Sequence, residues 1–131
     1  MYNIYISTPI NARVETDFND KLAGALDRVM AIKELLDKIY PNHTVNDIST
    51  FDINPIGLMT EEEAMARCIH AVLKCDAIIL DKDWEKSKGC QLEATAAKLY
   101  GKQIFFYSQV EYAKEHDKSI LQIDGSTANP Q

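Results

Sequence analysis

Hydrophobic and polar positions follow two different periods along the first part of the chain. Residues 2–8, YNIYIST, alternate with a period of two and are rich in aromatic and β-branched side chains, which predicts a strand that Pro9 ends. Apolar residues recur every three or four positions over 17–40, which predicts a long amphipathic helix that Pro41 ends. The segment 44–53 is predicted as a second strand, although its alternation is poor.

The same succession continues in the middle of the chain. Thr60-Glu61-Glu62-Glu63 has the pattern of a capping box and predicts a helix over 61–74. The short apolar run 76–82 is typical of a buried strand. It leads into a polar loop, 83–88.

The last predicted elements are two helices with a strand between them. The first helix is Ala-rich and runs over 89–100, and Gly101 stands at the position typical of a C′ glycine. Residues 103–107 form the strand. Ser108-Gln109-Val110-Glu111 is a second capping-box pattern, which predicts a final helix up to about Lys118.

The resulting order, βαβαβαβα, predicts one α/β domain over residues 1–118, followed by a polar C-terminal tail, 119–131. Right-handed crossovers then give a flavodoxin-like or Rossmann-like three-layer sandwich with a mainly parallel sheet of four or five strands. Ligands of such sheets bind outside the carboxyl ends of the strands. Those ends correspond here to the loops 7–14, 52–60 and 83–89 and to the segment from 108 onward.

Composition excludes several classes of protein. The 131 residues carry a net charge of −6, so a nucleic-acid polymer is not expected as a partner. No apolar run is long enough to span a membrane, and the N-terminus does not read as a signal peptide. Three cysteines without C-x-x-C spacing favour a reducing cytoplasm. With three histidines and no H-x-x-x-H pattern, we expect no metal site and no cofactor.

Glu93 is the main candidate for chemistry. The strand before it leads into a loop with Ser87 and Gly89, and Glu93 follows just inside the next helix. Alanines at 94, 96 and 97 let that helix lie close to the sheet. A carboxylate in this place could act as a nucleophile or a base, or it could be an early-helix acid favoured by the helix dipole.

Two parts of the chain carry a combination of motifs. These are Ile4-Tyr5-Ile6-Ser7-Thr8-Pro9 at the start and Cys75-Asp76, Trp84, Ser87-x-Gly89-x-x-x-Glu93 and Gly101-Lys102-Gln103-Ile104 further on. Together they resemble the signature of the nucleoside 2-deoxyribosyltransferase superfamily, most of all its small branch of bacterial and phage domains of unknown function. The resemblance covers residues 2–107.

The resemblance implies a role for several of these residues. Glu93 would attack the anomeric carbon of a 2′-deoxyribosyl group, and Tyr5 would orient it, although Tyr5 could also be a strand tyrosine packed under a helix. Ser87 stands where nucleotide hydrolases of the superfamily meet a 5′-phosphate, and a hydroxyl at a helix N-terminus suits an anion. Ser7, Pro9 and Gly89 complete the expected substrate-binding set.

Cys68 is a departure from the superfamily pattern. An aspartate that helps to protonate the departing base usually stands eight residues before the position of Asp76. A thiol has a pKa of about 8.5 and donates a proton only weakly, and Cys68 could equally be a small buried side chain. Trp84 is either a lid over the base or an anchor at an interface.

We therefore expect a nucleoside or nucleotide 2-deoxyribosyltransferase or N-glycosidase. Its small-molecule ligand would be a nucleoside or a nucleoside 5′-monophosphate. The alternatives are a catalytically impaired nucleotide-binding module and a phage or prophage accessory protein. The resemblance, Trp84 and six tyrosines in so short a chain also predict a homodimer or a higher homo-oligomer.

Overall fold

The computed structural model describes residues 2–9, 15–40, 45–53 and 59–116, with the backbone alone for 15–23 and 39. Its elements are β1 (Tyr2–Ser7), α1 (Glu15–Ile39), β2 (Val45–Ser49), α2 (Thr50–Ile53), α3 (Glu61–Lys74), β3 (Ala77–Leu80), the 3-10 turn η1 (Trp84–Lys86), α4 (Lys88–Leu99), β4 (Gln103–Phe106) and α5 (Tyr107–His116). The predicted tail, 119–131, lies outside the described residues.

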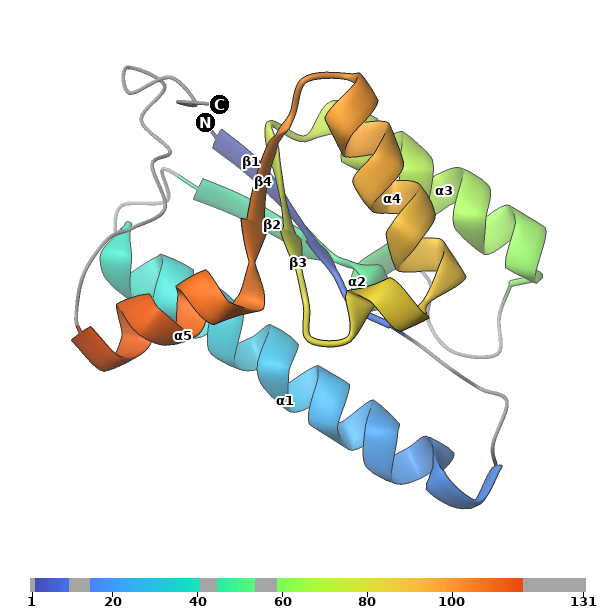
Figure 1. Ribbon diagram of the computed structural model, residues 1–131, viewed down its shortest axis with the longest axis horizontal. Helices are drawn as coiled ribbons and strands as arrows, with labels where there is room; N and C mark the ends of the chain where they lie inside the picture. Colours follow the sequence, from blue (N-terminus) through green and yellow to red (C-terminus); the bar gives the residue numbers. More distant parts are fainter. Residues whose placement is uncertain (1, 10–14, 41–44, 54–58, 117–131) are drawn as a thin grey trace.

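The four strands form one parallel sheet in the order β2-β1-β3-β4. Helices α1 and α5 cover one face, and α3 and α4 cover the other (Figure 1). This arrangement confirms the predicted three-layer α/β sandwich and its four-stranded parallel sheet. The central pair, β1 and β3, is flanked on both sides, so both strands are buried on both faces.

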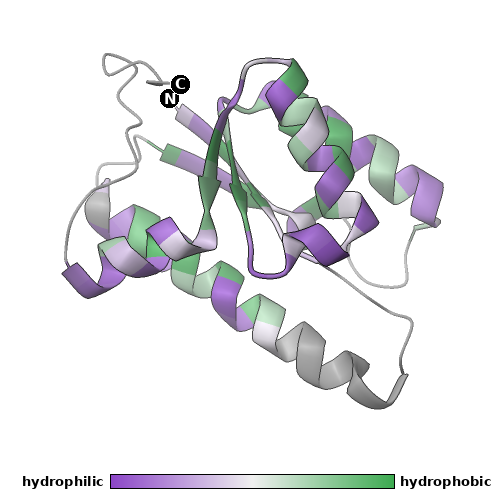
Figure 2. Cartoon of the chain, in the orientation of Figure 1, coloured by the Kyte–Doolittle hydropathy of each residue, from purple (hydrophilic) through white to green (hydrophobic). Residues whose placement is uncertain are grey.

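The core is divided by the sheet into two clusters. Side chains of β1 alternate between them: Ile4 and Ile6 pack with α1 and α5, and Tyr5 packs with α3 and α4. The β3 strand is apolar throughout and is buried along its length, as its predicted type requires (Figure 2). The alternation along β1 is what sends the Tyr5 ring toward the α3–α4 layer.

Local caps set several of the helix ends. The Thr60 hydroxyl accepts a hydrogen bond from the backbone N–H of Glu63, which confirms the predicted start of α3. The predicted helix over 89–100 begins one residue earlier, because Ser87 caps it through the N–H of Cys90. At the other end Gly101 has φ of +70°, as a C′ glycine should.

The expectation for the second strand is wrong at its C-terminal end. The predicted strand 44–53 ends at Ser49, and α2 follows directly. The reason is local: the Asp52 carboxylate accepts hydrogen bonds from the backbone N–H and the hydroxyl of Ser49, which turns the chain.

The capping box predicted at Ser108 does not form, because α5 already begins at Tyr107. The Gln109 side chain instead accepts a hydrogen bond from the N–H of Phe106 at 2.7 Å. The strand before it accordingly ends at Phe106 rather than at 107. No helix within the described ranges has both the length and the apolar character needed to cross a bilayer.

Candidate active site

The ends of three neighbouring strands bring the candidate residues together. Because β1 lies between β2 and β3, the residues that follow all three meet at the carboxyl edge of the sheet. Ser7 is in register with Leu80 across the β1–β3 pair. The α4 helix starts after β3, packs against α3 and the sheet, and carries Glu93 to this edge.

The Glu93 carboxylate receives one hydrogen bond on each oxygen. The Tyr5 hydroxyl donates to Oε2 at 3.0 Å, and the Ser7 hydroxyl donates to Oε1 at 2.5 Å. Glu93 is 2% exposed, and both donors are fully buried. The distance between Tyr5 and Glu93 agrees with the expectation that this tyrosine orients the glutamate. Ser7 was expected to contact substrate, but its hydroxyl bonds to Glu93. Contact between Ser7 and substrate therefore stays a prediction.

Thr50 supports the tyrosine from the far side. Its hydroxyl lies 3.2 Å from the Tyr5 hydroxyl and accepts a hydrogen bond from the Thr8 N–H at 3.1 Å. Thr50 was not among the residues predicted for the site, because it was expected inside a strand. The S-x-x-D pattern of Ser49 and Asp52 was the available signal that the chain turns here. The Thr8 hydroxyl is buried and makes no hydrogen bond with any described residue.

Cys68 reaches the same cluster from α3. Its thiol is 3% exposed and lies near enough to Tyr5 and Glu93 to affect the pKa of both. Burial, together with the negative charge of Glu93, raises the pKa of Cys68 to about 11. The thiol therefore stays protonated at neutral pH beside the carboxylate.

Burial and hydrogen bonding act in opposite directions on Glu93. Burial raises its pKa above the ordinary value for a glutamate, and the hydrogen bonds from Ser7, Tyr5 and Cys68 lower it. Burial also raises the pKa of Tyr5 well above its usual range, and the negative charge of Glu93 adds to this. The carboxylate is thus solvated by three groups that remain uncharged.

Ser87 lies at the start of the helix that carries Glu93. Its hydroxyl accepts a hydrogen bond from the backbone N–H of Cys90, and burial raises the pKa of the Cys90 thiol to about 12. Gly89, one residue into α4, has a packing role: a Cβ there would lie 3.2 Å from Sδ of Met65 on α3.

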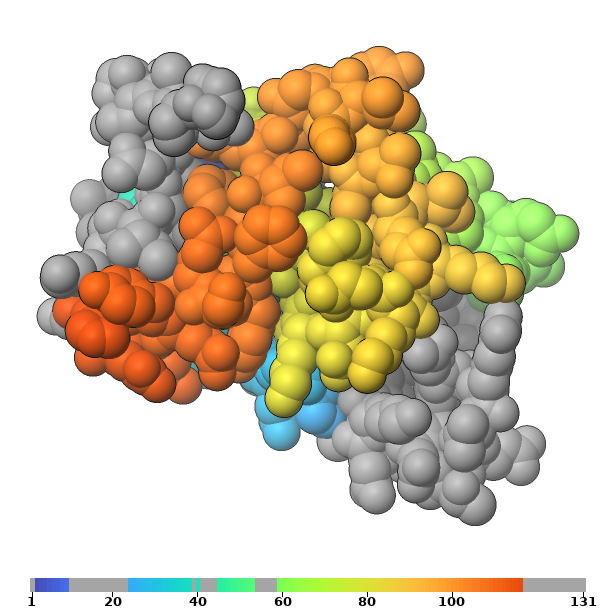
Figure 3. All heavy atoms as spheres, viewed as in Figure 1, coloured from blue at the N-terminus to red at the C-terminus, as the bar shows by residue number. Residues whose placement is uncertain are grey.

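Trp84 lies on the loop between β3 and α4. It is half-buried against the α3–α4 side of the core, and its ring centre is 6.2 Å from that of Phe106. Figure 3 shows the β3–α4 loop and the β4–α5 segment side by side on one surface. Asp83, just before Trp84, has φ of 63° in the left-handed region, which an aspartate tolerates. Pro9 is half-buried beyond the end of β1.

A second buried carboxylate was not predicted from the sequence. Asp81, directly after β3, is 1% exposed and pairs with Arg28 of α1. The Arg28 Nε lies 2.9 and 3.0 Å from the two carboxylate oxygens. This ion pair ties the α1 layer to the same edge of the sheet. Asp76, in contrast, accepts a hydrogen bond from the N–H of Asn3 at the opposite edge.

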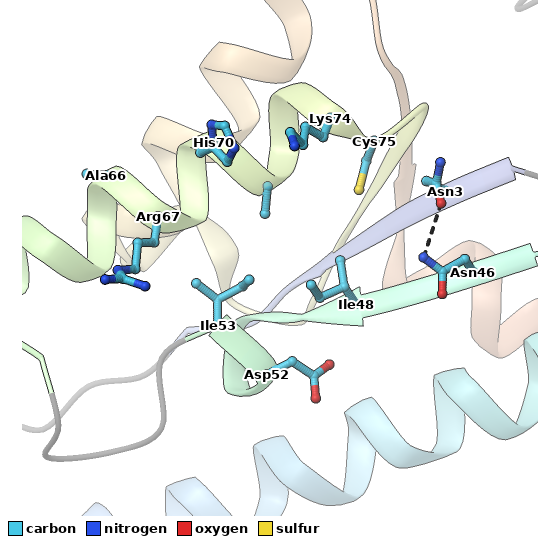
Figure 4. Close-up of a pocket in the computed structure, with 11 residues that line it drawn as sticks. Asn3, Asn46, Ile48, Asp52, Ile53, Ala66, Arg67, His70, Lys74 and Cys75 are labelled. Carbon is cyan, nitrogen blue, oxygen red and sulfur yellow. Dashed lines mark hydrogen bonds between the residues drawn. The ribbon is translucent and has the colours of Figure 1, made fainter.

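A cavity of about 870 Å³ lies elsewhere, between α3 and the edge strand β2 (Figure 4). Arg67 and His70, which flank Cys68 in the sequence, line this cavity and not the Glu93 cluster. Within the described ranges, no group of three or more His, Cys, Asp or Glu side chains is placed to hold a metal ion.

Comparisons with known proteins agree with this fold. The chain is similar to the solved structure of a 2-desoxiribosyltransferase from Leishmania mexicana, with a TM-score of 0.50 and 19% sequence identity. The similarity covers 81% of this chain and 63% of that one, so the chain spans less than two thirds of its relative. A comparison with curated proteins found no match. The model of the family described as a domain of unknown function, DUF4406, matches residues 2–106. The deoxyribosyltransferase resemblance therefore holds for the fold, and the chain belongs to the DUF4406 family.

Proposed function

We propose that this protein cleaves the bond between base and deoxyribose in a nucleoside or a nucleoside 5′-monophosphate, with Glu93 as nucleophile. One observation carries the proposal: a nearly fully buried carboxylate at the carboxyl edge of the sheet is held by Tyr5 and Ser7, one on each oxygen. A carboxylate with only a structural role would be unfavourable here, because burying its charge costs free energy that burying a neutral side chain would not cost. Nucleophiles and bases are often found in such surroundings.

The reaction would follow the retaining logic of glycosidases. A Glu93 oxygen attacks the anomeric carbon as the bond from that carbon to the base nitrogen breaks, and the base departs with the bonding electrons. A covalent ester between sugar and Glu93 results. Water then resolves it to free sugar, or a second base resolves it to a new nucleoside. Tyr5, whose hydroxyl donates a hydrogen bond to Oε2 of Glu93, would keep the attacking oxygen aligned.

The departing base also needs a proton. Cys68 stands at the superfamily's aspartate position, but its pKa of about 11 makes it a weak acid at neutral pH. We therefore expect slow turnover, limited by departure of the base. Substrates with bases that leave easily should react fastest.

A 5′-phosphate is the second feature of the proposed substrate. Ser87 sits at the N-terminus of α4, where backbone N–H groups and the helix dipole favour an anion. Lys86 and Lys88 flank it and are exposed. Together these groups favour a nucleoside monophosphate over the uncharged nucleoside.

The experiment is a base-release assay on the full chain. Deoxynucleosides and their 5′-monophosphates are incubated with the protein, free base is measured by chromatography, and intact mass reveals a sugar adduct. We expect release by the wild type and none by Glu93→Gln. Glu115→Gln, an exposed glutamate of α5, serves as the matched control and should keep full activity. Equal release by the wild type and by Glu93→Gln would overturn the proposal.

A nucleotide-binding module that has lost turnover is the second candidate, and Cys68 favours it. Such a protein would show no base release, but a nucleotide would still raise its melting temperature, because a ligand that binds only the native state stabilises it. A phage accessory protein without a small ligand would show neither effect.

Two further parts of the proposal concern the setting of the protein. Its three cysteines are all unpaired and buried, which supports a reducing compartment such as the cytoplasm. A homo-oligomer remains part of the proposal.

A further inference from the structure

A second polar group lies at the carboxyl edge, on the side of the sheet that α1 covers. Asp81, the first residue after β3, is 1% exposed, and both of its carboxylate oxygens accept hydrogen bonds from Arg28 of α1. The end of β3 lies beside the middle of this long helix (Figure 1). Glu93 and its donors lie on the α3–α4 side of the sheet. The Arg28–Asp81 pair therefore belongs to a separate part of the same edge.

Arg28 uses only part of its guanidinium group in this pair. Both contacts to Asp81 come from Nε, and among the described residues neither Nη1 nor Nη2 has a hydrogen-bond partner. The Arg28 side chain is 27% exposed, so a ligand can reach it. Gly24, one turn earlier in α1, has no side chain, and a Cβ there would lie 3.6 Å from Nη1. The guanidinium is thus held at one nitrogen and open at the other two.

Thr8 adds a buried hydroxyl that has no partner. Ser7 is in register with Leu80, and its carbonyl accepts a hydrogen bond from the N–H of Asp81, so Thr8 and Asp81 are the next neighbours along the two strands. Because the Ser7 side chain bonds to Glu93 on one side of the sheet, the alternation of the strand places Thr8 on the other, with Asp81. Thr8 is 2% exposed, and its hydroxyl bonds to no described residue. A buried hydroxyl in this state is unfavourable, and a ligand oxygen would satisfy it.

We propose that Arg28 and Thr8 bind a phosphate group at this edge, with Asp81 as the residue that positions Arg28. The two Nη groups and the hydroxyl supply donors for all three terminal oxygens of a phosphate monoester. A carboxylate has only two oxygens and would leave one of these groups unpaired. Asp81 does not repel the phosphate at contact, because it is buried and its oxygens already accept from Arg28 and from the N–H of Lys82.

The phosphate would be part of a nucleotide whose deoxyribose lies at Glu93, and this identity of the ligand rests on the proposed function. Ser87, at the start of α4, and Arg28 lie on the two sides of the segment that leaves β3. A nucleotide that crosses the end of β3 therefore meets both residues. The site itself does not depend on turnover, so it can be tested without it.

The first test uses inorganic phosphate, which the proposed reaction does not consume. Calorimetry on the full chain at constant ionic strength should show binding by the wild type. Arg28→Lys keeps a positive charge beside Asp81 but replaces the planar guanidinium with one ammonium group, so the affinity for phosphate should fall by about tenfold or more. Arg67→Lys makes the same substitution on an exposed arginine of α3 and should bind phosphate as the wild type does.

Thr8→Val separates binding from a structural role. Valine has nearly the shape of threonine and no hydroxyl, so the variant without ligand should be at least as stable to urea as the wild type. Its affinity for phosphate should nevertheless fall by about tenfold, because one donor to a charged group is lost. A hydroxyl with only a structural role would alter stability and leave phosphate binding unchanged. This variant also decides the matter if Arg28→Lys fails to fold, which circular dichroism would show.

The proposal is overturned if the wild type does not bind phosphate in the millimolar range. It is also overturned if a folded Arg28→Lys or Thr8→Val protein binds phosphate as tightly as the wild type, or if Ser87→Ala alone abolishes binding. Titration with a deoxynucleoside 5′-monophosphate and 5′-diphosphate then identifies the phosphate: Arg28→Lys weakens both ligands if it is the first, and only the diphosphate if it is the second. Phosphate binding without any base release would reject the proposed reaction and keep this site.

Discussion

At the scale of single residues, the surroundings of Glu93 determine what its carboxylate can do. Three uncharged donors surround it, and burial opposes its ionisation. A lysine or arginine in contact would make the carboxylate easier to ionise and less reactive as a nucleophile. Uncharged donors instead lower the pKa of Glu93 against the effect of burial, while leaving its charge available to an electron-poor carbon.

Tyr5→Phe tests this balance. The substitution removes the hydroxyl that donates to Oε2 and keeps the ring that packs under α3 and α4. Since that hydrogen bond lowers the pKa of Glu93, its loss should raise the pKa further. The acid limb of kcat/KM against pH should therefore move to higher pH. Tyr107→Phe is the matched control, and its pH profile should coincide with that of the wild type. An unmoved limb in Tyr5→Phe would show that Tyr5 does not position an ionised glutamate.

Cys68→Asp tests the supply of a proton to the base. A carboxyl group there can be a stronger acid than a thiol, and general acids contribute about 10²- to 10⁴-fold, so base release should rise by at least tenfold. A second buried carboxyl group beside Glu93 costs about 1–3 kcal/mol of stability, which urea unfolding measures. Cys68→Ser, with a hydroxyl of similar size and no useful acidity, should give no increase. A folded Cys68→Asp protein with unchanged release would exclude this position as the acid.

The sequence was most informative where one motif fixed both position and chemistry. The resemblance paired Tyr5 with Glu93 in advance, and a strand end and an early helix position do meet at one edge of a parallel sheet. The Arg28–Asp81 pair could not be foreseen. It joins the middle of a long helix to a strand end 53 residues away, and no local pattern indicates which arginine reaches which aspartate.

At the scale of elements, the predictions were good for centres and weaker for ends. A buried apolar run defines β3, because a strand covered on both faces must be apolar, and period-two alternation defines β1. The boundaries depend instead on side chains that bond to the backbone. Asp52 turns the chain after β2, and Gln109 supports the start of α5. Several residues near each end could serve as such a cap, so the sequence alone does not select between them.

Two glycines in helical contexts should respond oppositely to alanine. Gly101 ends α4 with φ of +70°, so Gly101→Ala should cost about 1 kcal/mol although a Cβ there meets no atom within 4 Å. Gly24 lies within α1, where a Cβ would make only an ordinary contact with Arg28, so Gly24→Ala should gain about 0.5–1 kcal/mol. Urea unfolding of both variants checks the prediction. A stabilised Gly101→Ala protein would contradict the left-handed cap.

At the scale of the whole molecule, the candidate site lies where the sheet and the α3–α4 layer meet. Tyr5 and Ser7 come from β1, Cys68 from α3 and Glu93 from α4. Packing of these elements therefore assembles the cluster, and the protein buries a carboxylate in doing so. The stability of the fold and the ionisation of Glu93 are consequently coupled.

The pH dependence of stability should reveal this coupling. Glu93 has a higher pKa in the folded chain than in the unfolded one, so its protonated form stabilises the fold. That contribution is complete below the unfolded pKa of about 4.3 and is lost as pH rises through the raised, folded pKa. Glu93→Gln stays neutral throughout and keeps an oxygen that accepts a hydrogen bond. The free energy of unfolding of Glu93→Gln minus that of the wild type should therefore grow from pH 4 upward and then level off. All other titrating groups are common to both proteins and cancel in the difference.

Urea unfolding at a series of pH values measures this difference in the free energy of unfolding, and the same difference for Glu115→Gln should not change with pH. If the Glu93→Gln difference shrinks as pH rises, the carboxylate is stabilised by its surroundings, and the view of Glu93 as a strained, reactive group is wrong.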